Sequence, residues 1–400
     1  MKKRMPALAI EWPFWPWFLA RLNRQELSGS LGDLGTFIPL LVGMTVTNGL
    51  DFASALFFAG LFNVATGFLF AIPMAVQPMK AIATIAIAEG LTVPQILAAG
   101  IITSAVVLML GITRLIDVFN RLIPLPVVRG LQLGLGLLLI EKGIGLVTQT
   151  GQWWSWDSML TGLMGFAFVL LFIRSVRIPT ALILFSLGLA VAWLTHPTIG
   201  EHMAVGIHLP RFVPIAADDF RIGFLRAAIA QIPLTTLNSV IAVCALSMDL
   251  FPDRPARPRP VAISVGAMNL IGCWFGAMPM CHGAGGLAGQ YRFGARTNAS
   301  ILFLGTVKMI LALFLGGSLL ALLRVYPQSI LGVLLGISGL ELAVAARDQN
   351  QREPAMIMLA TAGSTLAFRS TALGFAIGWG LALLFHLTRS RHTDQSTDER

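Results

Sequence analysis

Hydrophobic residues occur along this chain in runs long enough to cross a lipid bilayer. A spanning helix needs about 20 predominantly apolar residues, and runs near that length recur between Leu27 and Leu387. The full-length segments expected in the first half are 27–46, 52–72, 94–112, 127–147, 158–173 and 179–194. Those in the second half are 224–250, 260–277, 300–323, 330–346, 354–367 and 371–387. With one short broken segment in each half, the pattern predicts an all-α polytopic membrane protein of seven plus seven segments.

The spacing of proline residues indicates that the second half repeats the first. Pro73-Met74 and Pro279-Met280 are 206 residues apart, and Pro124 and Pro327, which each open a segment, are 203 apart. Residue identity between the halves is faint, so the regular spacing carries this inference. Because each half has an odd number of segments, we expect an inverted repeat.

The same pattern divides the chain into five parts. We expect a cytoplasmic or interfacial N-terminal segment (1–26), a first repeat (27–195), an inter-repeat loop (196–223), a second repeat (224–387) and a cytoplasmic tail (388–400). Trp and Phe residues between Trp12 and Phe18 favour the membrane interface, although a short core helix has a similar pattern. Glu11, Pro13 and Pro16 interrupt the stretch that would otherwise resemble a signal peptide.

The two short segments are broken by similar sequences. The first break runs from Ala71 to Ala81 and the second from Phe275 to Gly289, and each contains a Pro-Met step before the chain becomes helical again. Matched broken segments in two halves indicate a binding site near the bilayer midplane of a secondary transporter. Two re-entrant loops packed only for structure are the alternative, but unpaired main-chain N–H groups are expensive at membrane depth.

Composition agrees with a membrane protein, and charge fixes its orientation. The chain is 56% hydrophobic and 12% charged, against about 25% charged in soluble domains. Its net charge of +9 is therefore interpreted as an insertion signal and not as a nucleic-acid surface. The loops assigned to one side carry most arginines, while the other side keeps Arg211, Arg221, Arg226, Arg324 and Arg369. This asymmetry predicts a multi-pass protein of the plasma (inner) membrane with both termini in the cytoplasm.

The three cysteines, Cys244, Cys273 and Cys281, lie in apolar segments and form no disulfide or zinc pattern. A metal at Cys281-His282 lacks a second ligand pair, so neither a metal nor a cofactor is expected. A membrane enzyme with a Cys281–His282 nucleophile–base pair is a further alternative. Adjacent helical residues point about 100° apart, which places such a pair poorly.

The motifs around the breaks resemble those of the molybdate transporter family, which is related to the sulfate permease (SulP) superfamily. The resemblance covers roughly residues 26–387, and the motif at 275–288 is its most specific part. The other similar motifs are Gly32–Thr36, Val76–Lys80, Val128–Gln132, Gln231–Leu234, Asn238–Cys244 and Glu341–Asp348. It implies the seven-plus-seven inverted repeat, a core domain moving against a gate domain, uptake of a tetrahedral oxyanion and possible homodimers. Only a short tail follows Leu387, so we expect the cytoplasmic regulatory domain that is usual in the wider permease superfamily to be missing, as it is in the molybdate branch.

An oxyanion without donors of its own needs N–H and O–H groups and positive potential, which two facing helix N-termini supply. The residues expected to bind it are Thr36, Gln77, Pro78, Met79, Lys80, Ala81, Gln231, Asn238, Cys281, His282, Gly283, Ala284 and Gly285. Lys80 either adds a full charge or pairs with Asp33 or Glu89. Gln231 and Asn238, seven residues apart, either share a face toward the site or form interhelical hydrogen bonds.

Importing a dianion against 100 mV costs about 4.6 kcal/mol, twice the cost for one charge. Concentrative uptake therefore requires a coupled cation, and we expect protons, with Asp33, His282 and Glu341 as candidate carriers. The other ionisable groups inside segments are Arg129, Glu141, Lys142 and Lys308; Arg129 and Lys142 lie near segment ends, where snorkelling also explains them. A passive anion channel and a sulfate permease of the same fold are the alternative functions, and tungstate is chemically equivalent as a substrate.

Overall fold

The computed structural model describes residues 21–116, 118, 122–172, 175, 178–202 and 205–398. The aromatic segment expected at the membrane interface, the basic residues Lys2, Lys3 and Arg4, and Arg121, Arg174 and Arg177 of the orientation argument lie outside these residues.

The regular secondary structure of the described residues is helical apart from two strands of two residues each. The first half comprises α2 (Arg24–Ser30), η1 (Leu31–Asp33), α3 (Leu34–Asn48), α4 (Phe52–Phe70), β1 (Gln77–Pro78), α5 (Lys80–Glu89), α6 (Val93–Thr113), α8 (Leu125–Gln149), α9 (Met159–Phe172) and α10 (Thr180–Thr195). The connection carries η2 (Pro197–His202). The second half comprises α11 (Ala217–Gly223), η3 (Phe224–Ala228), α12 (Ile229–Leu234), η4 (Thr235–Ala242), α13 (Val243–Leu250), α14 (Pro258–Gly272), η5 (Cys273–Phe275), β2 (Met280–Cys281), α15 (Ala284–Arg292), α16 (Ala299–Arg324), α17 (Gln328–Val344), η6 (Ala345–Asp348), α18 (Arg352–Ala367) and α19 (Thr371–Asp398). Eight helical stretches of the described chain are long and apolar enough to cross a membrane, and α9 and α10 are shorter apolar helices. The all-α membrane fold is confirmed.

Helices pack across the two halves in reciprocal pairs. Helix α4, the second segment of the first half, packs against α16, the fourth of the second half; α14 and α6 make the same contact with the halves exchanged. The pairs α9–α17 and α8–α18 are related in the same way. Contacts that recur with exchanged partners are the mark of a two-fold relation, so the packing supports the inverted repeat.

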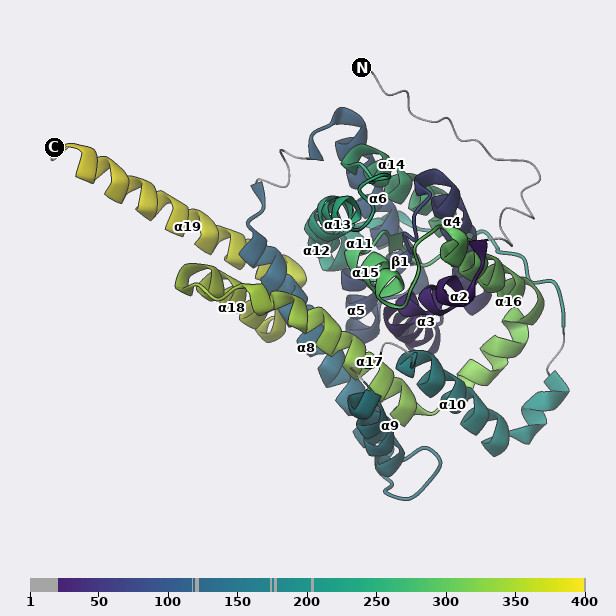
Figure 1. The fold of residues 1–400 in the computed structure, drawn as a ribbon. Coiled ribbons are helices and arrows are strands. Elements are labelled where there is room, and N and C mark those ends of the chain that lie inside the picture. The colour runs from purple at the N-terminus through teal and green to yellow at the C-terminus, as the bar shows by residue number, and fades with distance from the viewer. Residues whose placement is uncertain are drawn as a thin grey trace, which may run out of the picture.

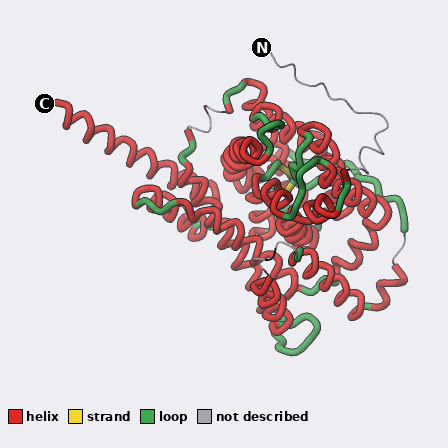
Figure 2. Tube along the Cα trace, viewed as in Figure 1, coloured by secondary structure: helices red, strands yellow, loops and turns green. Residues whose placement is uncertain are grey.

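The helices form two bodies. Figure 1 shows α2–α6 and α11–α16 gathered around β1, whereas α8, α17, α18 and α19 extend away from them. In Figure 2 the strands lie inside the first body, surrounded by helices. We call the first body the core and the second, with α9 and α10, the gate.

Glycine pairs set the close approach of α8 and α17 at the centre of the gate. A Cβ placed on Gly136 would lie 2.6 Å from the Gly339 oxygen, and one on Gly143 would lie 2.5 Å from the Gly332 oxygen. Small residues allow this backbone proximity, and lipid-embedded helices gain van der Waals contact from it.

Two segments differ clearly from the expected pattern, the eighth and the last. The eighth segment begins at Ala217, inside the stretch expected to be loop, because Asp219 accepts a hydrogen bond from the Ala216 N–H (2.9 Å) and caps the helix. The same segment contains two π-helical stretches, η3 and η4. Helix α19 continues to Asp398, through most of the expected tail.

Candidate functional site

The two breaks lie side by side in the core. Strands β1 and β2 pair antiparallel, with Gln77 opposite Cys281 and Pro78 opposite Met280. The Met79 N–H also donates to the Pro279 oxygen (2.8 Å). The extended backbone of one break thus satisfies polar groups of the other, as is required away from water. Both half-helices, α5 and α15, start from this pair.

Two buried asparagines hold the breaks in place. Asn63 of α4 accepts a hydrogen bond from the Val76 N–H (2.8 Å). Asn269 of α14 accepts one from the Met280 N–H (2.7 Å) and donates to the Met280 oxygen (2.6 Å). Asn63 and Asn269 are 206 residues apart, the separation of the two Pro-Met steps. The repeat therefore extends to the side chains that support the site.

The N-terminus of α5 is closed by a side chain. The Gln231 oxygen Oε1 accepts from the N–H groups of Ala81 (2.9 Å) and Ile82 (3.2 Å), and its Nε2 donates to Thr235 Oγ1 (2.8 Å). We expected the Ala81 N–H and the Gln231 amide to face an anion, and both are instead bonded to each other. Gln231 is a cap for the half-helix.

The expected shared face of Gln231 and Asn238 is also not formed. Gln231 is 1% exposed, whereas Asn238 is partly exposed. The intervening π-helical η4 uses i→i+5 bonds, so the spacing of seven that suits an α-helix does not align the two side chains.

The N-terminus of α15 is open. Its N-cap residue is Gly283, no side chain caps it, and Gly285 is exposed. The first N–H groups of a helix have no intrahelical acceptor, so Ala284 and Gly285 present donors together with the positive end of the helix dipole. Helix α15 starts at Ala284.

Gln77 reaches across to this open end. Its Nε2 donates to Asp33 Oδ1, and Gly283 and Gly286 leave the space that its amide occupies: a Cβ on Gly286 would lie 3.0 Å from Gln77 Cδ. Residues with side chains at these two positions would displace the amide. Gly283 and Gly286 thus make room for the Gln77 amide, and the N-terminus of α15 stays accessible.

Lysines add positive charge to this region. Lys80, at the start of α5, is partly exposed and lies within electrostatic range of Asp33, Cys281 and Glu341. Of the alternatives for Lys80, the pairing with Glu89 is not formed, because Glu89 Oε2 lies 3.7 Å from Arg226 Nε in an ion pair.

Lys308 of α16 is 3% exposed, and its Nζ lies 3.4 Å from the centroid of the Phe37 ring. It interacts electrostatically with Asp33.

Cys281 and His282 are both buried but face different neighbours. Ser239 Oγ lies 3.1 Å from Cys281 Sγ. His282 Nε2 lies 2.9 Å from Ser264 Oγ, and its ring contacts Phe70 edge-on with centroids 5.6 Å apart. Ser264 is bonded to Nε2 alone, so the expected role of His282 as a donor to the anion stays a prediction.

The other predicted site residues differ in their exposure to solvent. Thr36 is partly exposed and Glu341, on the gate, is exposed, whereas Pro78 and Met79 are buried. Asn63, Asn269 and the capping role of Gln231 were not predicted. Asn63 and Asn269 could have been found from the sequence, because they are separated by the same 206 residues as the two Pro-Met steps.

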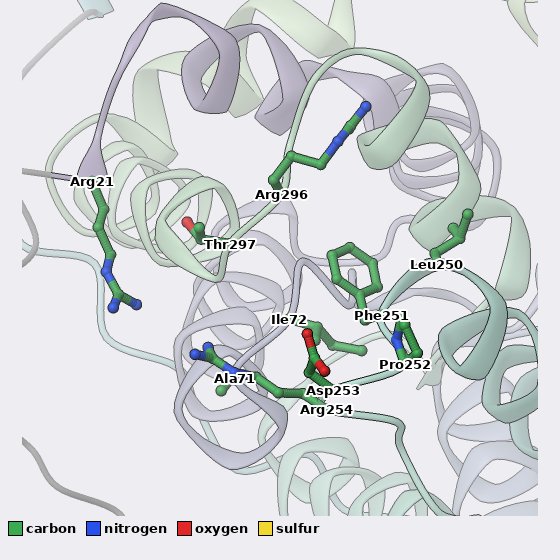
Figure 3. A pocket seen from close by; sticks show the side chains of 10 residues that line it. All are labelled: Arg21, Ala71, Ile72, Leu250, Phe251, Pro252, Asp253, Arg254, Arg296 and Thr297. Carbon is green, nitrogen blue, oxygen red and sulfur yellow. The ribbon is translucent and has the colours of Figure 1, made fainter.

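A separate cavity of about 430 Å³ lies beside the start of the first break. Figure 3 shows the ten residues that line it: Arg21, Ala71, Ile72, Leu250, Phe251, Pro252, Asp253, Arg254, Arg296 and Thr297. The Arg296 guanidinium donates to the oxygens of Tyr291 (2.6 Å) and Ala295 (2.8 Å). No predicted site residue lines this cavity, so it is distinct from the half-helix pair.

Comparisons with known proteins bear on the family and the fold of this chain. The family model described as "Molybdate transporter of MFS superfamily" matches residues 25–139 and 223–342, one stretch in each half. Molybdate transporter 2 of Arabidopsis thaliana is 46% identical over 93% of this chain and 90% of its own length.

Two solved structures share the fold. The transmembrane domain of a cyanobacterial bicarbonate transporter, BicA, has a TM-score of 0.64 at 14% identity and covers 89% of this chain and 97% of its own. The murine anion transporter Slc26a9 in the inward-facing state has a TM-score of 0.67 at 15% identity, covering 97% of this chain and 74% of its own.

Proposed function

Because this chain belongs to the molybdate transporter family, we propose that it is a secondary active transporter that imports molybdate. The family model covers more than half of the chain, and the Arabidopsis relative is named a molybdate transporter. The observation that carries the proposal is the open N-terminus of α15 beside a capped α5. One half-helix is closed by Gln231, so the main-chain donors for an anion come from the other.

The proposed site combines three kinds of group around Gly283, Ala284 and Gly285. The N–H groups of the α15 N-terminus donate to the oxyanion, and the helix dipole adds about half a positive charge. Lys80 adds a full charge from the opposite break; its Nζ lies 3.9 Å from a Cβ placed on Gly285. Thr36 adds a partly exposed hydroxyl. A tetrahedral dianion has only acceptor oxygens, which matches a set made only of donors.

We propose proton coupling through Asp33 and Glu341. Asp33 is 1% exposed and bonded to Gln77; Glu341 is exposed on the gate within electrostatic range of Lys80. Protonation of either carboxyl removes a negative charge near the anion and so favours its binding. The core carries the anion past the gate, and Lys80 of the core interacts electrostatically with Glu341 of the gate.

Uptake of labelled molybdate into proteoliposomes tests the proposal. We expect accumulation above equilibrium that is driven by an inward pH gradient and lost when the gradient is collapsed. Accumulation that is unchanged when the pH gradient is collapsed would refute proton coupling. A flux that only brings molybdate to equilibrium across the membrane would indicate a channel. Excess sulfate separates a molybdate carrier, whose uptake survives, from a sulfate permease of the same fold.

A thiol enzyme is the competing class, and Cys281→Ala separates it. Since the one hydrogen bond of the thiol among the described residues is from Ser239, the variant should keep most molybdate uptake, with wild-type protein measured in parallel. Loss of nearly all activity would favour a chemical role for the thiol.

A further inference from the structure

Lys308 is a buried cation that the proposed anion site does not use. It lies on α16, its residue is 3% exposed, and its Nζ has no hydrogen-bond acceptor in the described part of the chain. The contact with the Phe37 ring, 3.4 Å from Nζ to the centroid, stabilises a cation but supplies no full countercharge. An isolated buried ammonium is strongly unfavourable, so its position requires an anionic partner.

Asp33 is a buried carboxyl, 1% exposed, that interacts electrostatically with Lys308. The two residues are 275 positions apart in the sequence; the Phe37 ring that the ammonium contacts lies four residues, about one helical turn, after Asp33. Asp33 Oδ1 accepts from Gln77, while Asp33 Oδ2 and Gln77 Oε1 have no partner among the described residues. One unsatisfied donor and two unsatisfied acceptors thus occupy one buried cluster. Buried polar groups are rarely left unpaired, so a proton, a water or a short movement of the ammonium must complete it.

Other charged groups near Asp33 do not replace Lys308. Lys80 and Cys281 also interact with it electrostatically, but Lys80 is partly exposed at the anion end and the Cys281 thiol is bonded to Ser239. Glu26 of α2 accepts from the N–H groups of Arg296 and Thr297 (2.8 and 2.9 Å) and so faces away.

The two other helices that pack on η1 contribute no charge near the carboxyl. Helix α15 carries its charged residue, Arg292, in its last turn, and α3 contains none.

We propose that Lys308 is a positioning residue whose ammonium holds the Asp33 carboxylate against the Gln77 amide and sets the pH range over which Asp33 exchanges its proton. When Asp33 is ionised, a short movement of the ammonium supplies the donor that Oδ2 lacks. When Oδ2 is protonated, that interaction weakens, and the positive charge is available to balance the incoming dianion. This inference rests on the proposed function, because it assigns Asp33 to proton-coupled anion uptake.

The test measures the affinity of the solubilised protein for molybdate as a function of pH, in wild type and in Lys308→Met. In wild type we expect affinity to fall as pH rises and Asp33 loses its proton. Removing a neighbouring positive charge makes the carboxyl hold its proton to higher pH, so in Lys308→Met the midpoint of the fall should move upward by about one pH unit or more. Lys142→Met, which removes a lysine of α8 in the gate, is the matched control and should leave the midpoint unchanged.

A second variant covers the case in which Lys308→Met does not fold. Asp33→Asn with Lys308→Met removes both charges and should restore thermal stability while abolishing the pH-dependent fall. A folded Lys308→Met with an unshifted midpoint, or a double variant no more stable than the single one, would overturn the inference. Absence of molybdate binding by wild type would instead refute the proposed function.

Discussion

At the scale of single residues, the site depends on side chains that satisfy or make room for the backbone. Gln231 closes two N–H groups of α5, and Gly283 and Gly286 make space for Gln77. None of these residues needs to touch the anion to determine where it binds. Their substitution is expected to change uptake by displacing the half-helix N-termini and the Gln77 amide.

Gln231→Ala should destabilise the protein and reduce molybdate uptake. The substitution leaves the buried N–H groups of Ala81 and Ile82 without an acceptor, at about 1–3 kcal/mol for each unsatisfied group. Gln95→Ala is the control, because Gln95 also caps a backbone N–H, that of Thr92 (3.1 Å), but at an exposed position. Thermal unfolding of the solubilised variants checks the prediction. An equal loss of thermal stability in the two variants would show that the buried cap at Gln231 stabilises the protein no more than the exposed one.

Gly283→Ala should reduce molybdate uptake about tenfold or more, corresponding to about 1.4 kcal/mol of lost interaction. Its methyl group would overlap the Gln77 amide and push it from Asp33. Gly363→Ala, where no atom lies within 4 Å of the added Cβ, should transport normally. Transport kinetics in proteoliposomes measure both, and normal uptake by Gly283→Ala would contradict the assigned place of Gln77.

At the scale of elements, the two breaks have matched supports of unequal strength. Asn269 makes both a donor and an acceptor bond to Met280, whereas Asn63 makes one bond to Val76. The half-helices are also unequal, since α5 is capped and α15 is open. A repeat that is symmetric in packing therefore gives an asymmetric site.

Asn269→Ala should impair uptake and stability more than Asn63→Ala. It leaves the N–H and the oxygen of Met280 unsatisfied in a buried segment, and it releases the break from which α15 starts. The two variants are each other's controls, because both truncate the same residue type at corresponding positions. An equal or greater loss in Asn63→Ala would show that the first break carries the site.

At the scale of the whole molecule, two ion pairs lie away from the half-helices. Arg129 donates to Asp348 (2.6 Å), and Arg369 lies 2.5 Å from Glu141. Exposed ion pairs of this kind contribute about 0–1 kcal/mol to the free energy of unfolding. The first pair joins α8 to η6, so Arg129 has a definite partner in addition to its position near a helix end.

Cysteine labelling tests the proposed orientation. In a background with the three native cysteines replaced, Ser155→Cys, between α8 and α9, should react with an impermeant maleimide on intact cells. Asp253→Cys, after α13, should react only after permeabilisation, because the basic loops predict that side to be cytoplasmic. The reverse pattern would invert the topology, and it would also reverse the direction proposed for transport.

Much of this protein was determined by local sequence. Apolar runs long enough to span a bilayer can be neither loops nor soluble helices, so the segments and the all-α class followed from hydropathy. The Pro-Met breaks followed from proline, which cannot continue a helix freely. The spacing of 206 residues exposed the repeat. Asp33 and Lys308 were noticed only as isolated charges within apolar segments.

Tertiary structure alone decided what those groups do. Hydropathy does not reveal which donor meets which acceptor, so the bonds from Ala81 and Ile82 to Gln231 and the proximity of Asp33 to Lys308 were not predictable. Both depend on helices far apart in sequence being packed at one place. The π-helical turns of η4 also change the register that an α-helical spacing implies. The sequence therefore determined that two half-helices exist, and packing decided which of them is open.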